Sequence, residues 1–269
     1  MEDAMADKKK SLHVVSLSGG KDSTAMLLRM LEEGMPVDVI LFCDTGLEFP
    51  ALYRHLEKHI GRGITRIKPD KPFEYYFLEH ESKRKSGEIR KGYSWAGPRM
   101  RWCTTRLKTQ PREKFLTPLR KEYEVIEYVG IAADEGFRLE RKINQRNECQ
   151  HPLVDWGMTE AECLQYCYDK GFDWEGLYNL FHRVSCWCCP LQSLEDLRKL
   201  YWNFPDLWKK LEYWDSLTWR NFRADYSVKD LERRFVFEVE WQKAGSRLGT
   251  RAFYFALSKH LEEAEGRTG

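Results

Sequence analysis

Short apolar runs alternate with amphipathic segments over the first seventy residues of the chain. Leu12–Leu17 and Val37–Cys43 are mainly apolar and end near glycine or aspartate, which is typical of buried strands. Alanine, methionine and leucine recur at helical spacing over Thr24–Leu31, and Leu52–Ile60 also has a helical pattern. Ile64–Ile67 predicts a third short strand. This alternation predicts a parallel sheet with right-handed helical crossovers.

The second half of the chain adds one clear strand and then becomes mostly helical. Val125–Ala132 is another buried-strand pattern. Thr159–Lys170 begins with threonine and has Glu162 three residues on, which is a capping-box pattern for a helix. We therefore expect an α/β domain at residues 12–190 and a mainly helical extension packed on it at residues 191–269.

Composition narrows the class of protein. Apolar residues make up 42% and aromatic residues 14% of 269 residues, enough to fill a sizeable core and to exclude a disordered chain. No apolar run approaches the 18 residues of a membrane span, and the lysines near the start precede no signal-peptide core. We expect a cytoplasmic protein. The tryptophans of the extension are expected in its core: Trp202, Trp208, Trp214, Trp219 and Trp241.

The strongest local motif is the octapeptide SLSGGKDS at residues 16–23, between the first strand and the first helix. Gly19 and Gly20 allow backbone N–H groups to wrap an anion, and the helix N-terminus adds further donors. The ammonium of Lys21 and the hydroxyls of two serines add charge-assisted bonds. The spacing is neither that of a Walker loop nor that of a dinucleotide fingerprint. The motif therefore predicts a distinct kind of phosphate-binding loop.

A basic segment interrupts the α/β pattern. Residues 83–114 hold eleven lysines and arginines against two glutamates, although the whole chain has a net charge of only +2. Tyr93, Trp95 and Trp102 are interleaved with the basic residues. Basic groups with aromatic rings between them are what a nucleic-acid partner requires. A solvated basic loop and a lid over nucleotide phosphates are equally open interpretations.

SGGKDS after a first strand resembles the PP-loop of the ATP pyrophosphatase and phosphoadenosine phosphosulfate (PAPS) reductase superfamily. Further segments resemble the narrower PAPS reductase family: FCDTGLEFP at 42–50, WCTTRLKTQP at 102–111, GIAADEGFR at 130–138, HPLVDW at 151–156 and parts of 177–190. The resemblance implies an α/β fold with a doubly wound, mostly parallel sheet flanked by helices, of the adenine nucleotide alpha-hydrolase-like type.

The resemblance also implies which residues bind the nucleotide and Mg²⁺. Ligands of open α/β sheets bind beyond the carboxyl ends of the strands, where the loop and two later strand ends meet. The implied nucleotide-binding residues are Ser16, Ser18, Gly19, Gly20, Lys21, Asp22, Ser23, Asp44, Thr45, Gly130, Glu135, Arg138 and Arg183. The expected catalytic residues are Lys21, Asp22, Asp44 and Asp134, whose carboxylates are candidates to hold Mg²⁺ through water.

Three thiols within four residues, at Cys186, Cys188 and Cys189, indicate a soft metal ligand set. Cys103 lies at a family-like position, but Thr104 follows it where related iron–sulfur reductases carry a second cysteine. Cys188 is then the candidate replacement, and these four cysteines favour a [4Fe–4S] cluster. Zinc and the absence of a metal stay open as alternatives. Cys163 and Cys167, four residues apart on one helix, are expected in the core.

The position of the last cysteine bears on the reaction class. Sulfonucleotide reductases of the family use a cysteine in a C-terminal Glu-Cys-Gly-x-His type motif, whereas residues 190–269 contain no cysteine. The SGGKDS form is typical of the pyrophosphatases. We therefore expect an ATP-binding enzyme that cleaves ATP to AMP and pyrophosphate and activates a substrate for sulfur transfer, in the manner of nucleic-acid thiolation.

The expected partners are an adenine nucleotide, a nucleic-acid substrate bound through segment 83–114 and a sulfur donor protein. The helical extension is a candidate homodimer surface. Two other functions remain open. One is a PAPS or adenosine phosphosulfate reductase-like enzyme that lacks the usual C-terminal cysteine. The other is a nucleotide-binding accessory protein without catalysis, which the intact set Ser18, Lys21, Asp22 and Ser23 disfavours.

Overall fold

The computed structural model describes residues 9–83, 87–140 and 149–264. The chain divides into two compact units. Unit 1 comprises the chain up to residue 73 together with residues 102–187, and unit 2 comprises residues 74–101 together with the chain from residue 188 onward.

Unit 1 is built on one parallel sheet of five strands. Their order across the sheet is β3 (Ile64–Ile67), β2 (Val39–Cys43), β1 (Ser11–Ser16), β6 (Glu124–Val129) and β7 (Cys149–Gln150). The chain moves outward from β1 to β3 and then returns to place β6 on the other side of β1. This order confirms the predicted doubly wound fold class, and the reversal beside β1 is the point where such sheets bind ligands.

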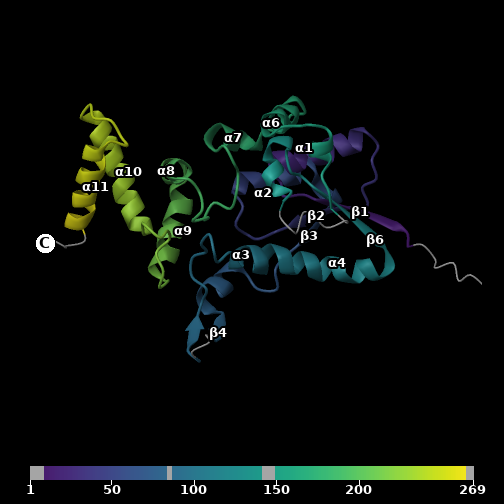
Figure 1. Cartoon of the computed structure of the whole chain (residues 1–269), viewed down its shortest axis with the longest axis horizontal. Coiled ribbons are helices and arrows are strands. Elements are labelled where there is room, and N and C mark those ends of the chain that lie inside the picture. Colours follow the sequence, from purple (N-terminus) through teal and green to yellow (C-terminus); the bar gives the residue numbers. More distant parts are fainter. Residues whose placement is uncertain (1–8, 84–86, 141–148, 265–269) are drawn as a thin grey trace, which may run out of the picture. The chain divides into compact units, whose positions relative to one another are not determined.

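Helices cover both faces of the sheet (Figure 1). One face carries α1 (Lys21–Glu32), α2 (Pro50–His59) and α6 (Glu160–Asp169), and the other carries α4 (Gln110–Glu122). The capping box predicted at the start of α6 is present. The first helix begins three residues earlier than the sequence pattern indicates, because the end of the phosphate-loop motif forms its first turn.

Shorter helical pieces complete unit 1. In chain order they are a 3₁₀ turn at Gly61–Gly63, α3 (Trp102–Thr104), a π turn at Thr105–Thr109, a 3₁₀ turn at Ala133–Arg138, α5 (Pro152–Asp155), a 3₁₀ turn at Trp174–Gly176 and α7 (Leu177–Leu180). The π turn runs directly into α4, so the second half of the basic segment is helical.

The core of unit 1 lies on both sides of the central strand. Val14 and Val15 are adjacent and so point to opposite faces, and both are fully buried. On the α4 side, Val14 packs in a cluster with Leu41, Leu116 and Val125. Burial on both faces is why these strands read as apolar runs in the sequence rather than as an alternating pattern.

Unit 2 combines a hairpin with the C-terminal helices. The hairpin pairs β4 (Glu81–Lys83) with β5 (Ile89–Lys91) and follows a π turn at Tyr75–Glu79. The helices are α8 (Leu194–Asn203), α9 (Pro205–Ser216), α10 (Val228–Lys243) and α11 (Arg251–Ala264), which confirms the predicted helical region. No helix among the described residues is long and apolar enough to cross a membrane.

Aromatic packing joins residues 74–101 to the C-terminal helices within unit 2. Trp95 is buried, its indole nitrogen donates to Asp215 Oδ1 at 2.7 Å, and its ring meets Phe222 edge-on at 4.9 Å. Trp208 and Trp214 are buried as expected, whereas Trp202 and Trp219 are about half exposed, so the prediction of a core position is wrong for these two. Trp202 lies in α8 and Trp219 in the bend after α9, and the residue type alone does not determine whether an indole meets the core.

We expect truncation of Leu116 to Ala to destabilise unit 1 by about 2–5 kcal/mol, because it leaves a cavity between α4 and the sheet. Urea unfolding followed by circular dichroism measures the loss. The control is Leu31→Ala on the exposed side of α1, where 53% of the side chain is accessible and the change should stay below about 0.5 kcal/mol. Equal losses for the two variants would contradict this assignment of the core.

Candidate functional site

The loop between β1 and α1 is held in shape by its own side chains. The Ser18 amide donates to Ser23 Oγ at 3.1 Å, and the two serine hydroxyls lie 2.9 Å apart. Gly19 has a φ of +81°, and a Cβ there would lie 2.9 Å from Leu52 Cδ2. The backbone angle therefore favours glycine at this position, and any larger residue would also have to displace the Leu52 side chain.

Several backbone donors of this loop remain available for a ligand. Among the described residues, the Gly19 amide has no hydrogen-bond acceptor, and the Gly20 amide makes only a long 3.4 Å contact with Ser18 Oγ. The loop leads into the N-terminus of a twelve-residue helix, which adds partial positive charge. The geometry is that of an anion-binding site.

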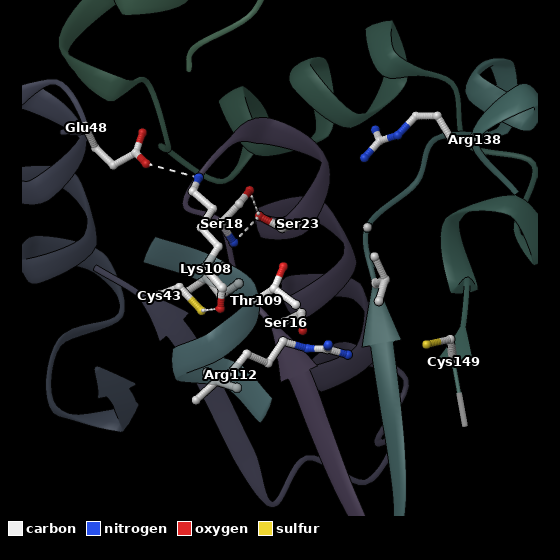
Figure 2. Close-up of a pocket in the computed structure, with 14 residues that line it drawn as sticks. Ser16, Ser18, Ser23, Cys43, Glu48, Lys108, Thr109, Arg112, Arg138 and Cys149 are labelled. Atoms are coloured by element: carbon white, nitrogen blue, oxygen red, sulfur yellow. Dashed lines mark hydrogen bonds and ion pairs between the residues drawn. The ribbon is translucent and has the colours of Figure 1, made fainter. Parts of the chain in front are cut away.

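A cavity of about 290 Å³ lies beside this loop, at the carboxyl ends of β1, β2 and β6. Figure 2 shows the polar residues around it: Ser16, Ser18, Ser23, Cys43, Glu48, Lys108, Thr109, Arg112, Arg138 and Cys149. Its position at the strand-order reversal is where open α/β sheets bind their ligands.

Three cationic side chains line this cavity. Lys108 Nζ lies 3.3 Å from Glu48 Oε1, Arg112 pairs with the fully buried Glu127, and Arg138 pairs with Glu135. Burial by itself lowers the pKa of Lys108, but the neighbouring Cys186 and Glu48 outweigh it and raise that pKa above its usual range. The lysine therefore stays charged at neutral pH, and an anion that replaced these carboxylate partners would meet three cations.

The lysine of the loop points to a group of carboxylates. Lys21 is buried, and its Nζ lies 3.0 Å from Asp22 Oδ1 and 3.3 Å from Glu160 Oε1. Asp22, Glu135 and Glu160 can each place a carboxylate oxygen within 4.8 Å of the others. Burial raises the pKa of Asp22, and Lys21 partly opposes that shift. Oxygen donors so arranged suit a hard divalent cation such as Mg²⁺.

Three predicted residues are engaged elsewhere instead of lining the cavity, two of them in a local turn and the third at the start of α6. Asp44 Oδ1 accepts hydrogen bonds from the Gly46 amide at 3.0 Å and the Tyr53 hydroxyl at 2.8 Å. Thr45 Oγ1 accepts from the Leu47 amide, and Asp134 Oδ1 accepts from the amide of Glu160 at the start of α6. Asp44, Thr45 and Asp134 are absent from the residues that line the cavity described above.

The other predicted residues fall into three places. Those that line the cavity are Ser16, Ser18, Ser23, Gly130 and Arg138. Gly19, Gly20, Lys21 and Asp22 form the loop and the first turn of α1, Glu135 joins the acidic group, and Arg183 is exposed. Sequence reasoning did not assign Glu48, Lys108, Thr109, Arg112, Cys149 or Glu160 to this site.

A signal for Lys108 and Arg112 was present in the sequence. Both belong to the basic segment 83–114, and Lys108 begins the Lys-x-x-Pro stretch at 108–111. The sequence left three interpretations of this segment open: a nucleic-acid surface, a solvated loop and a lid over nucleotide phosphates. Its second half supplies two cations to the cavity of unit 1. Arg84 and Lys85 of the same segment lie outside the described residues.

The cysteines proposed as metal ligands are all present as thiols. Cys103 and Cys186 are half-buried in unit 1, and Cys186 Sγ lies 3.6 Å from Glu48 Oε1. Cys188 and Cys189 begin unit 2. Thiols are soft donors, the type that iron–sulfur clusters and zinc take. Among the described residues, however, the group that lies close enough together to hold one metal ion is Asp22, Glu135 and Glu160, not these cysteines. Cys163 is fully buried, and burial raises its pKa to about 12, in keeping with a packing role.

Comparison with known proteins gives two matches. Residues 12–192 match the phosphoadenosine phosphosulfate reductase domain family. An uncharacterized protein of Methanocaldococcus jannaschii is 28% identical over 242 residues, which cover 83% of this chain and 44% of that protein. The chain thus spans less than half the length of this relative.

We expect Gly130→Ala to destabilise unit 1 by about 1–3 kcal/mol, because the new Cβ would lie 2.8 Å from the Cα of Ser23 in the first turn of α1. Thermal unfolding measures the change. Gly136→Ala is the matched control, since a Cβ there meets no atom within 4 Å. The packing of the cavity wall on α1 is refuted if both variants unfold at the wild-type temperature.

Proposed function

This chain belongs to the phosphoadenosine phosphosulfate reductase domain family of the PP-loop, adenine nucleotide alpha-hydrolase-like superfamily, and on that premise we propose that it cleaves ATP to AMP and pyrophosphate. The observation that carries the proposal is the preformed loop with available amides beside a cavity that Lys108, Arg112 and Arg138 line. Donors and cations placed together in this way suit a polyphosphate.

In this proposal the loop and the side chains around the cavity have different roles in phosphate binding. Backbone amides of Gly19 and Gly20 and the N-terminus of α1 bind phosphate oxygens, while Lys108 and Arg138 supply positive charge. Asp22, Glu135 and Glu160 would hold Mg²⁺, which neutralises phosphate charge when bound. Lys21 then exchanges its carboxylate partners for phosphate oxygens and stabilises the charge that develops on the leaving pyrophosphate.

The chemical step we propose activates an acceptor for sulfur transfer. An oxygen of the acceptor attacks the α-phosphorus, the bond between the α- and β-phosphates breaks, and pyrophosphate leaves with the bonding electron pair. Sulfide supplied by a donor protein then bonds to the acceptor atom that carries the adenylated oxygen. The bond between that atom and its oxygen breaks, and AMP leaves with the oxygen and the bonding electron pair. ATP is thereby spent to exchange an oxygen for a sulfur.

A [4Fe–4S] cluster held by Cys103, Cys186, Cys188 and Cys189 belongs to this proposal. Support comes from the donor set alone, four thiols of soft character. When bound, such a cluster supplies redox chemistry or an iron that binds sulfur. Within unit 1, Glu48 contacts both Cys186 Sγ and Lys108 Nζ, so it connects one of these thiols to the wall of the cavity.

We further propose a nucleic acid as the acceptor. Within unit 2, the Arg90 guanidinium lies 4.0 Å from the ring centroid of Trp219, which is half exposed. An exposed indole beside a basic group is a stacking platform for a base of a single strand. The first half of the basic segment thus supports acceptor binding, and its second half supports binding of the nucleotide.

The cavity also offers an observation in favour of sulfonucleotide reduction. Cys43 and Cys149 line it, and either thiol would be placed to attack a sulfonucleotide. Burial, however, raises the pKa of Cys43, which disfavours the thiolate that such an attack requires. The ATP-dependent reaction is therefore the better supported of the two.

We expect ATP with Mg²⁺ to bind at least about tenfold more tightly than PAPS, a difference of about 1.4 kcal/mol. Equilibrium competition on anaerobically purified protein measures it. Lys21→Ala should lose ATP turnover, read as pyrophosphate release, because the leaving group then lacks its cation. Leu31→Ala on the exposed side of α1 is the control for intact protein. Preferential binding of PAPS would reverse the proposed reaction class.

Anaerobic purification should yield about four iron atoms per chain with a brown chromophore, in keeping with a four-thiolate cluster. Iron analysis and absorbance spectra are the measurements. Cys186→Ser should lose the iron, whereas Cys163→Ala, in the buried core of α6, should retain it. Stoichiometric zinc without colour would exclude the cluster.

A further inference from the structure

The chain between α6 and α7 contains a left-handed turn that no sequence motif predicts. Trp174, Glu175 and Gly176 have φ angles of +49°, +52° and +79°. Two of these residues carry a side chain, and the left-handed region is sterically unfavourable for such residues. Such strain persists only where the surrounding contacts hold the backbone in place, so the turn requires an explanation.

Contacts with α2 hold this turn. Arg54 forms a two-pronged pair with Glu175, with nitrogen–oxygen distances of 2.8 and 2.5 Å. Asp173 Oδ1 accepts the Glu175 amide at 3.0 Å. The indole of Trp174 stacks on the ring of His55 with centroids 4.6 Å apart. Burial, together with the nearby His59, lowers the pKa of His55 to about 4. The imidazole ring is therefore uncharged at neutral pH and packs against the indole as a neutral ring.

Two polar atoms of this region contact the backbone of the phosphate loop. The Trp174 indole nitrogen donates to the carbonyl of Gly19 at 2.7 Å, and the side chain is fully buried. The Tyr178 hydroxyl oxygen accepts the amide of Lys21 at 2.8 Å. A Cβ on Gly20 would lie 3.2 Å from that oxygen, so the hydroxyl packs directly against the loop.

These two bonds determine where the loop amides point. The carbonyl and the N–H of one trans peptide point in opposite directions. When Trp174 fixes the carbonyl of Gly19, it therefore turns the N–H of Gly20 to the other side. When Tyr178 fixes the N–H of Lys21, it turns the carbonyl of Gly20 toward α1, where the Ser23 hydroxyl and the Thr24 amide bind it.

We propose that Trp174 and Tyr178 are positioning residues that orient the amides of the loop for a polyphosphate without touching it. The inference rests on the proposed function, since it assigns polyphosphate as the ligand of the loop. The strain at residues 174 and 175 is then the local cost of placing both polar atoms against one short stretch of backbone.

The test compares Trp174→Phe and Tyr178→Phe with the wild type in calorimetric titrations of pyrophosphate with Mg²⁺ and, separately, of adenosine. Each variant keeps an aromatic ring and removes one hydrogen bond to the loop. We expect about three- to tenfold weaker binding of pyrophosphate and unchanged binding of adenosine, since one hydrogen bond is lost and only the phosphate donors lose their orientation.

Tyr128→Phe is the matched control. It removes a hydroxyl that lies 2.9 Å from His13 Nδ1 and does not contact the loop, so it should bind both ligands as the wild type does. Wild-type affinity for pyrophosphate in both loop variants would overturn the inference alone. Equal losses for pyrophosphate and adenosine would also overturn it, because they indicate general loosening of the unit. A wild type that binds neither pyrophosphate nor ATP would overturn the proposed function, and the inference with it.

Discussion

A buried backbone amide without a hydrogen-bond acceptor costs free energy unless a ligand supplies the acceptor. In unit 1, the packing around the loop between β1 and α1 holds such amides, those of Gly19 and Gly20, in place. The loop follows β1, the central strand, which pairs with β2 on one side and β6 on the other. Gly130 at the end of β6 lets that strand approach the first turn of α1. Sheet, helix and loop therefore share one rigid framework, which presents donors to an anion before any anion arrives.

Charge around the loop follows from the same arrangement. The cations near the cavity have carboxylate partners: Lys21 has Asp22 and Glu160, Lys108 has Glu48, and Arg138 has Glu135. Pairing lets charged groups be buried without a prohibitive desolvation cost. It also means that a polyphosphate must compete for these cations. A divalent cation on the acidic group would weaken that competition, so metal and nucleotide binding are expected to support each other.

Much of unit 1 can be predicted from the sequence, because the patterns that indicate its strands and helices lie within short stretches of the chain. The strands at 64–67 and 124–129 and the capping box of α6 appear where apolar runs and side-chain spacing predict them. The loop motif likewise depends on six consecutive residues. The roles of Asp44 and Asp134 could not be predicted in the same way. Their position after buried strands can be seen in the sequence. The amides and the hydroxyl that donate to their carboxylates meet them only in the folded chain.

The sequence by itself determined the fold class, the phosphate loop and the family, because each is encoded by periodicity or by residues adjacent in the chain. Tertiary structure decided which distant groups meet. Lys108 and Arg112 joined the cavity, Trp95 joined the C-terminal helices, and Trp174 and Tyr178 reached the backbone of the loop from about 155 residues away. Such contacts depend on how helices pack on a sheet, and hydrophobic spacing along one element carries no record of the side chain that another element will place against it.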